Sequence, residues 1–330
     1  MPPSPSADFD RRTLLRAVPG LLTLFASSVS AAWRPAFADT RPEVSPGSFV
    51  AEIAPGVYAH RGQIALYAPA NEGDISNAGF IVGREAVAVI DTGGSARIGA
   101  RLHQAIRSIT PLPIRYVINT HMHPDHVFGN AAFEADQPAF VGHHKLARGL
   151  GARADRYLSI NKEALGEEAF AGTKIVLPTL AISTPTVLDL GGREILLEPQ
   201  KTAHTDNDLI VRDRQTGTVF LGDLLFSEHA PTLDGSILGW MAVLDTLTKE
   251  PIQRVVPGHG GPSMPWPDAA APLRHYLQVI ADEIRAMIKA NRTLSEATER
   301  VGLSEKSAWS LFEDYHVRNV SAAFAELEWE

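Results

Sequence analysis

The chain has 330 residues, of which 45% are hydrophobic and 21% are charged, a balance typical of a folded globular protein. Its formal net charge of −8 disfavours nucleic acid or an anionic membrane surface as a partner. It contains no cysteine, which excludes a disulfide framework and a thiolate metal site, so any metal ligands must be histidine and carboxylate.

Residues 1–38 predict an export signal. Arg11 and Arg12 form a twin-arginine pattern, a weakly apolar stretch follows, and Ala36 and Ala38 fit a small-x-small cleavage site. The apolar stretch is short and broken by proline and glycine, so no stable membrane span is predicted after cleavage. The mature protein would then be periplasmic. The alternatives for this segment are a plain N-terminal anchor helix and a disordered tail.

Residues 39–265 predict one α/β domain that begins with a sheet. Four short β runs separated by turns form it, at residues 49–53, 57–60, 78–82 and 86–90. His60 precedes a turn and is predicted to lie on the surface. Asp91 directly follows the last run and is predicted as a turn former. Residues 95–109 then have the apolar spacing of a helix.

A cluster of metal-binding side chains follows the next predicted strand, residues 114–120. His121, His123, Asp125 and His126 lie within six residues. The proline after His123 disfavours helix there, so the strand should open into a loop. Side chains two apart in an extended loop project to the same side, so the first two histidines can bind one ion. Asp125 and His126 come after the turn and can face a second ion. Zinc suits this mixture of imidazole and carboxylate.

Three more candidate ligands follow downstream, each beside a predicted strand. His204 lies between the strands predicted at residues 194–198 and 209–211. Asp223 comes after a hydrophobic strand, and His259 lies on a glycine-rich turn after another. Each of these signals is weak alone, but their order after the HxHxDH motif is specific.

This set resembles the five-part pattern of the metallo-β-lactamase superfamily over residues 48–265. The resemblance implies a four-layer αβ/βα sandwich with metals at one edge of two packed sheets. It implies two zinc ions, the first held by His121, His123 and His204, the second by Asp125, His126 and His259, and both bridged by Asp223. It also implies that Asp91 is a carboxylate that orients the metal loop.

Two zinc ions that share a carboxylate hold a water between them and lower its pKa, so that a hydroxide can attack a polarised carbonyl or phosphoryl group. Asp125 would orient that hydroxide or relay its proton. Classes that hydrolyse β-lactams generally lack the bridging aspartate, whereas thioesterases of the glyoxalase II type, lactonases and phosphodiesterases have it. Asp223 therefore favours a hydrolase of a small-molecule ester, thioester, lactone or related bond, with β-lactamase activity as an alternative.

The ligand set also suits iron or manganese. An iron-dependent oxidoreductase on the same fold, such as a persulfide dioxygenase, is therefore an alternative function. A non-catalytic binder is the other, although a complete ligand set argues against it.

A narrower resemblance is to the SoxH-related zinc metallohydrolases that accompany periplasmic quinoprotein dehydrogenase systems. It rests on the export signal, residues 203–211 (AHTDNDLIV), residues 235–244 and the sequence Arg318-Asn319-Val320. It implies a hydrolase accessory to a periplasmic quinoprotein system.

Several positions around the ligands have more than one interpretation. His143 and His144 end a predicted strand and are expected to be structural or on the surface. Trp240, on a helix predicted at residues 236–247, is either a core residue or a pocket wall. His229 is either a polar group of the pocket or a loop residue.

The remaining segments are helical or complete the second sheet. Residues 128–133 predict a short helix, and residues 145–165 predict an amphipathic helix that could flank the mouth of the site. Residues 180–188 predict a strand joined to residues 194–198 by a glycine hairpin turn. Residues 266–330 are predicted to be a helical segment packed on the core, with helices at residues 268–288, 294–301 and 307–315.

Overall fold

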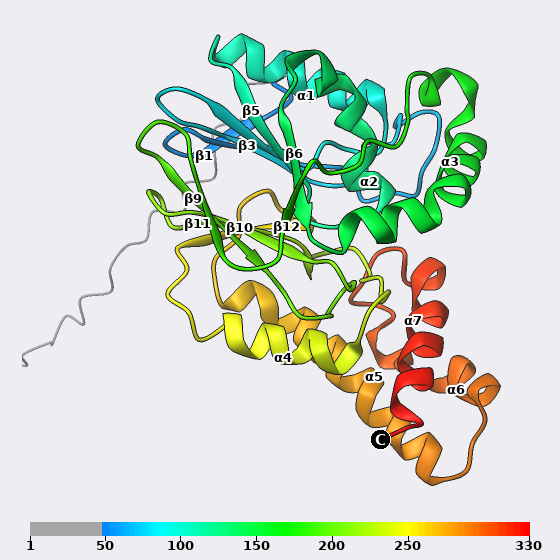
Figure 1. Cartoon of the computed structure of the whole chain (residues 1–330). Helices are drawn as coiled ribbons and strands as arrows, with labels where there is room; N and C mark the ends of the chain where they lie inside the picture. The colour runs from blue at the N-terminus through cyan, green and yellow to red at the C-terminus, as the bar shows by residue number, and fades with distance from the viewer. Residues whose placement is uncertain (1–47) are drawn as a thin grey trace, which may run out of the picture. The chain divides into compact units, whose positions relative to one another are not determined.

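Two β-sheets pack face to face, with helices on their outer faces, in the computed structural model of the chain (Figure 1). The structure describes residues 48–330, so the predicted export signal and the lead-in that follows it lie outside the described residues. The sheets and the C-terminal helices belong to the same compact unit.

The first sheet has seven strands in chain order. They are β1 (Ala51–Ala54), β2 (Val57–His60), β3 (Ala78–Val82), β4 (Val87–Ile90), β5 (Ile114–Ile118), β6 (Ala139–His143) and β7 (Leu180–Ile182). The first four pair antiparallel, and β4 to β7 pair parallel. Parallel strands require crossover connections, which here include α1 (Ala96–Ile109) between β4 and β5.

The second sheet has five strands in the order β12, β11, β10, β9, β8. They are β8 (Thr186–Asp189), β9 (Glu194–Pro199), β10 (Leu209–Asp213), β11 (Thr218–Phe226) and β12 (Arg254–His259). β11 and β12 pair parallel and the other neighbours antiparallel.

The alternation of side chains along the strands places apolar groups on both faces of each sheet. In β4, Ala88 and Ile90 join the cluster between the two sheets, whereas Val87 and Val89 pack outward with Leu102 of α1. The outer face of the second sheet is covered by α4 (Ile237–Leu247) and α5 (Ala271–Lys289). The predicted four-layer αβ/βα sandwich with a C-terminal helical extension is therefore confirmed.

The remaining helices follow the metal loop or end the chain. They are α2 (Pro124–Val127), η1 (Phe128–Asp136), α3 (Leu146–Phe170), η2 (Asp268–Ala270), α6 (Leu294–Arg300), η3 (Leu303–Glu305) and α7 (Phe312–Leu327). No helix in the part of the chain that the structure describes is long and apolar enough to cross a membrane.

Three predicted elements differ from the structure. The strand predicted at residues 180–188 is divided at Pro185, and its halves, β7 and β8, join different sheets, because proline cannot donate to a ladder. The helix predicted at residues 307–315 begins only at Phe312, after Leu311 in the left-handed region with φ 59°. The strand predicted to end before Asp223 continues to Phe226, so this aspartate lies inside β11.

Candidate metal centre

The loop after β5 carries the first four candidate ligands, and its backbone is held from the neighbouring strand. The backbone N–H of Thr120 donates to Asp91 Oδ1 at 2.8 Å. His123 has extended dihedral angles, φ −68° and ψ 147°, and Pro124 begins the single turn of α2 directly after it. The proline therefore ends the extended segment, as predicted, and places His126 on a helical turn facing back toward β4.

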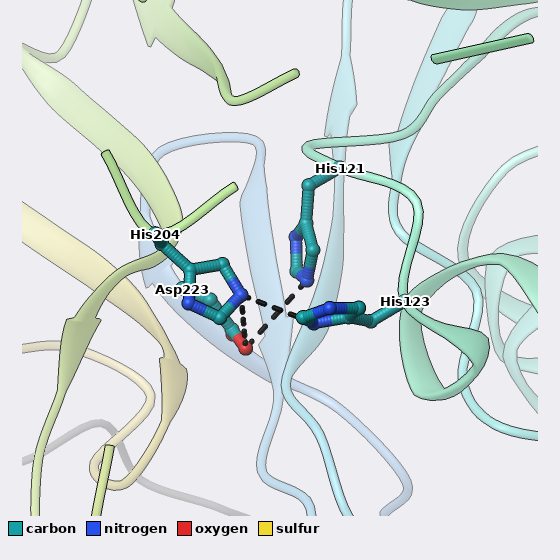
Figure 2. A group of neighbouring side chains, drawn as sticks. All are labelled: His121, His123, His204 and Asp223. Carbon is teal, nitrogen blue, oxygen red and sulfur yellow. Dashed lines mark hydrogen bonds and ion pairs between the residues drawn. The ribbon is translucent and has the colours of Figure 1, made fainter. Parts of the chain in front are cut away.

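The structure brings together four residues from three segments of the chain. Figure 2 shows the rings of His121, His123 and His204 pointing toward the carboxylate of Asp223. His204 Nε2 lies 3.1 Å from His123 Nδ1 and 3.4 Å from Asp223 Oδ2, and His121 Nε2 lies 3.6 Å from the same oxygen. All four side chains are buried.

A second group lies beside the first. His126 Nε2 and His259 Nε2 lie 3.3 Å and 3.2 Å from Asp125 Oδ2. Asp223 also reaches this group, with Oδ1 3.1 Å from His126 Nε2 and Oδ2 3.5 Å from His259 Nε2. Asp223 is thus the one member of the seven-residue set whose carboxylate contacts histidines of both groups. The assignment of all seven as metal ligands stays a prediction.

Each histidine uses one ring nitrogen to anchor itself and turns the other toward the centre. His204 Nδ1 lies 2.7 Å from the carbonyl of Thr232, and His259 Nδ1 lies 2.9 Å from the carbonyl of Ile75. A carbonyl can only accept, so Nδ1 carries a proton in both rings and Nε2 is the nitrogen that faces the centre. His123 is turned the other way, with Nε2 3.1 Å from Asp234 Oδ2 and Nδ1 facing the centre.

Asp91 orients one histidine of each group. Its Oδ2 accepts from His126 Nδ1 at 2.9 Å and from the hydroxyl of Thr120 at 2.7 Å. Because that hydroxyl donates its one hydrogen to the carboxylate, its oxygen accepts from His121 Nδ1 at 3.0 Å. Asp91 has φ 53°, an uncommon conformation for a residue other than glycine that clusters at functional sites. It is therefore an orienting carboxylate and more than a turn former.

The donor set fits a pair of small cations. Among the described residues, no hydrogen-bond partner exists for the buried atoms His121 Nε2, His126 Nε2 and Asp223 Oδ1. The ring nitrogens opposite the two anchored ones, His123 Nδ1 and His204 Nε2, also face each other at 3.1 Å. Ligands about 2.0–2.1 Å from a tetrahedral zinc are separated by about 3.3 Å, close to these spacings.

The charges of the centre are tightly paired. Burial alone would lower the pKa of His126, but the carboxylates of Asp223, Asp125 and Asp91 together raise this pKa well above its ordinary value. Burial alone would raise the pKa of Asp223, but the neighbouring histidines, His126 foremost, hold it well below its ordinary value. The aspartate is therefore ionised across the physiological range, as a metal ligand must be.

A small pocket opens over the centre, and four of the seven residues, His123, Asp125, Asp223 and His259, line it. Its volume is about 200 Å³, and its walls include His229 and the tyrosines Tyr67, Tyr157 and Tyr315. Burial raises the pKa of each tyrosine, to about 12 for Tyr157, so each phenol keeps its proton and can donate a hydrogen bond. His229 is 2% exposed and lines this pocket. Of its two interpretations, a polar group of the pocket is therefore the one that the structure supports.

The other ambiguous positions are also placed. Trp240 is fully buried and donates from Nε1 to the carbonyl of Leu224, so it is a core residue that supports the ring of His204 from behind. His143 is buried and His144 exposed, and neither belongs to a metal-type cluster among the described residues. The surface prediction for His60 is wrong. It is 7% exposed because its ring bonds to Asp74, which is distant in sequence.

The C-terminal helix α7 supports the loop that anchors two of the histidines. Asn319 Oδ1 accepts from the backbone N–H of Leu233 at 2.9 Å, and its Nδ2 donates to the carbonyl of Pro231 at 2.6 Å. This loop supplies Thr232 and Asp234, which hold His204 and His123. The sequence singled out Asn319 only within a short resemblance, because its loop partners cannot be identified from spacing.

Replacing Asn319 with alanine should lower the free energy of unfolding by about 3 kcal/mol, because it leaves two buried backbone groups of the loop without partners. The candidate ligand group that includes His123 and His204 should also bind its metal ion less tightly. Urea unfolding of the apo and metal-loaded protein measures both effects. Ser321→Ala is a matched control on the same helix, since its hydroxyl bonds only within α7. An unchanged unfolding curve for Asn319→Ala would contradict the anchoring role.

The comparisons with known proteins were consistent with this geometry. Residues 71–259 match the family model of the metallo-beta-lactamase superfamily. A solved structure, a metallo-beta-lactamase from Pontibacter korlensis, superposes with a TM-score of 0.56 and 21% sequence identity, covering 69% of this chain and 98% of that one. At this identity the likeness shows the fold alone. No curated protein matches the chain.

Proposed function

The chain belongs to the metallo-beta-lactamase superfamily, and from this premise we propose that it is an exported dinuclear zinc hydrolase. Its substrate in this proposal is a small molecule with an ester, thioester, lactone or related bond. The observation that carries the proposal is the pair of adjacent donor groups, three histidines on one side and two histidines with Asp125 on the other, that share the carboxylate of Asp223.

When bound, two zinc ions would supply a water activated at neutral pH and would polarise the bond under attack. The chain would contribute the orientation. Asp125 lines the pocket, and its pKa is held well below its ordinary value by His126 and His259, although burial alone would raise it. It is therefore an ionised acceptor that can orient the attacking water through a hydrogen bond. The neutral tyrosines of the pocket can donate hydrogen bonds to the developing negative charge.

Metal analysis and a substrate panel test the proposal together. We expect the purified protein to bind about two zinc ions per chain and to hydrolyse at least one member of a panel of thioesters, lactones, β-lactams and phosphodiesters. A coloured protein with bound iron that consumes a persulfide and oxygen would instead support an oxidoreductase. A metal-free protein inactive on the whole panel, with zinc added, would refute the hydrolase.

Periplasmic export and an accessory role in a quinoprotein system are parts of the same proposal. They are supported by Arg11 and Arg12 ahead of the apolar stretch and by the narrower sequence resemblance. The twin-arginine route moves folded proteins, which suits an enzyme that acquires its metal before export.

Replacing both arginines, Arg11→Lys with Arg12→Lys, should trap the protein in the cytoplasm. Cell fractionation and immunoblotting measure the periplasmic share of the wild type and the double variant. Arg41→Lys, outside the predicted signal, is the control and should be exported normally. Equal periplasmic accumulation of the double variant would show that the export signal is assigned wrongly.

A further inference from the structure

A second hollow adjoins the pocket over the candidate metal centre. Its volume is about 560 Å³, compared with about 200 Å³ for the pocket. The two share Pro124, Tyr157 and Arg318 in their walls, so they lie side by side at these residues. Helix α3 supplies most of the residues that line this hollow, and α7 supplies Arg318.

Three arginines line this hollow, which we call the arginine hollow. Arg153 and Arg156 belong to one face of α3, together with Tyr157 and Ile160, at the helical spacing of three and four residues. Arg318 reaches the hollow from α7. None of the described residues that line it is acidic, although the whole chain has a net charge of −8. The hollow is therefore a local positive site in an acidic protein.

Two of the arginines, Arg153 and Arg318, lie near one carboxylate, that of Asp234, at distances longer than a close ion pair. Arg153 Nη2 lies 3.5 Å from Asp234 Oδ2, and Arg318 Nη2 lies 3.6 Å from Asp234 Oδ1. The side chains of the two arginines are 40% and 62% exposed, whereas that of the aspartate is 17% exposed. One carboxylate cannot neutralise two guanidinium groups, and most of their N–H donors remain free. Arg156 forms no ion pair with any described residue.

The pocket over the candidate metal centre is too small to hold a typical substrate on its own. A volume of about 200 Å³ is smaller than the roughly 300–1,000 Å³ of a typical small-molecule site, so most substrates would project beyond it. The part of the substrate that extends past the shared residues would enter the arginine hollow. Guanidinium groups bind carboxylates through paired, charge-assisted hydrogen bonds.

We infer that the arginine hollow is a substrate subsite, formed by Arg153, Arg156 and Arg318, that binds a carboxylate on the part of the substrate distant from the bond to be cleaved. This inference rests on the proposed hydrolase function and specifies its substrate class as acyl compounds with an anionic tail. Ile160 and Tyr157 would contact the carbon chain between the two ends.

Two thioesters of N-acetylcysteamine test the subsite, because they differ only at the far end of a six-carbon chain. Adipoyl thioester ends in a carboxylate and hexanoyl thioester in a methyl group. We expect kcat/KM of the wild type to favour adipoyl by about tenfold or more, mainly through KM. The double variant Arg156→Gln with Arg318→Gln should lose about tenfold of this preference. High salt should weaken the preference in the wild type.

Two further variants separate charge from structure. Lysine at both positions keeps the charges and should restore part of the preference for the adipoyl chain. Arg148→Gln is the matched control, since Arg148 is exposed on the same helix and lies outside the walls of both hollows. The inference is overturned by a wild type that does not prefer the adipoyl chain, or by a double glutamine variant that keeps the preference.

A binding measurement distinguishes failure of the subsite from failure of the proposed hydrolysis. Calorimetric titration with adipate needs no turnover and can be run with and without zinc. If neither thioester is cleaved but adipate binds the wild type at least about tenfold more tightly than the glutamine variant, the subsite stands, and the full substrate panel alone decides whether the hydrolase proposal fails. Equal binding of adipate to both proteins, or no binding, overturns the subsite.

Discussion

Replacing Asp223 with asparagine should lower the metal content from about two ions per chain to about one and slow hydrolysis at least about a hundredfold. The carboxylate contacts histidines of both groups, so it can bond to both ions and offset the repulsion between two close dications. The amide has no charge for this role and one weak oxygen ligand. The ion of Asp125, His126 and His259 should be lost first, because only two histidines hold it.

Elemental analysis of the wild type and the variant measures this directly. Asp213→Asn is the matched control, because Asp213 is also a buried carboxylate but, at the end of β10, it pairs with Arg193 rather than with the metal groups. It should lose stability and keep about two ions. A wild type with a single metal, or an Asp223→Asn variant with both ions and full activity, would refute the bridging role. The first of these results would also reopen the iron alternative.

The layered fold, and the proximity of the seven candidate ligands to one another, could both be predicted from the sequence. β-branched strands buried on both faces have a strong apolar signal, and each candidate ligand lies within, at the end of or beside such a strand. Strand ends converge at one edge of a sandwich, and the resemblance to the superfamily pattern predicted which side chains meet there. The extent of β11 was not predictable, because a strand can continue past Gly222, whose φ of 52° bends it and shifts its register.

The groups that orient the histidines could not be found from spacing. Asp234 and the carbonyl of Thr232 lie in a loop with no regular pattern, and their position depends on Asn319, which is 85 residues further along the chain than Asp234. His60 was misplaced for the same reason, since its partner comes from another loop. Local patterns predict which strand a side chain follows, whereas contacts between loops depend on the completed fold.

Deleting residues 268–330 should give insoluble protein. The buried side chains of α5 and α7, among them Leu273, Tyr276, Ile280 and Phe324, form one apolar cluster with Trp240 of α4. Burial of each large apolar side chain stabilises by about 1.5–3 kcal/mol, so the loss of several exceeds the typical stability of about 5–15 kcal/mol. The remaining face of α4 would be an exposed apolar patch that promotes aggregation.

The deletion also removes groups that the candidate site needs. A buried polar chain runs from Asn319 to the hydroxyl of Tyr276, on to His316 Nδ1, and from His316 Nε2 to the carbonyl of Val301, and it joins α7, α5 and the end of α6. Deleting only residues 328–330 is the control, because these residues are exposed and that protein should stay soluble and bind metal. Soluble yield and metal content decide the outcome. A soluble, fully active protein without residues 268–330 would show instead that the helices are a detachable module, and the arginine hollow would then lose its wall from α7.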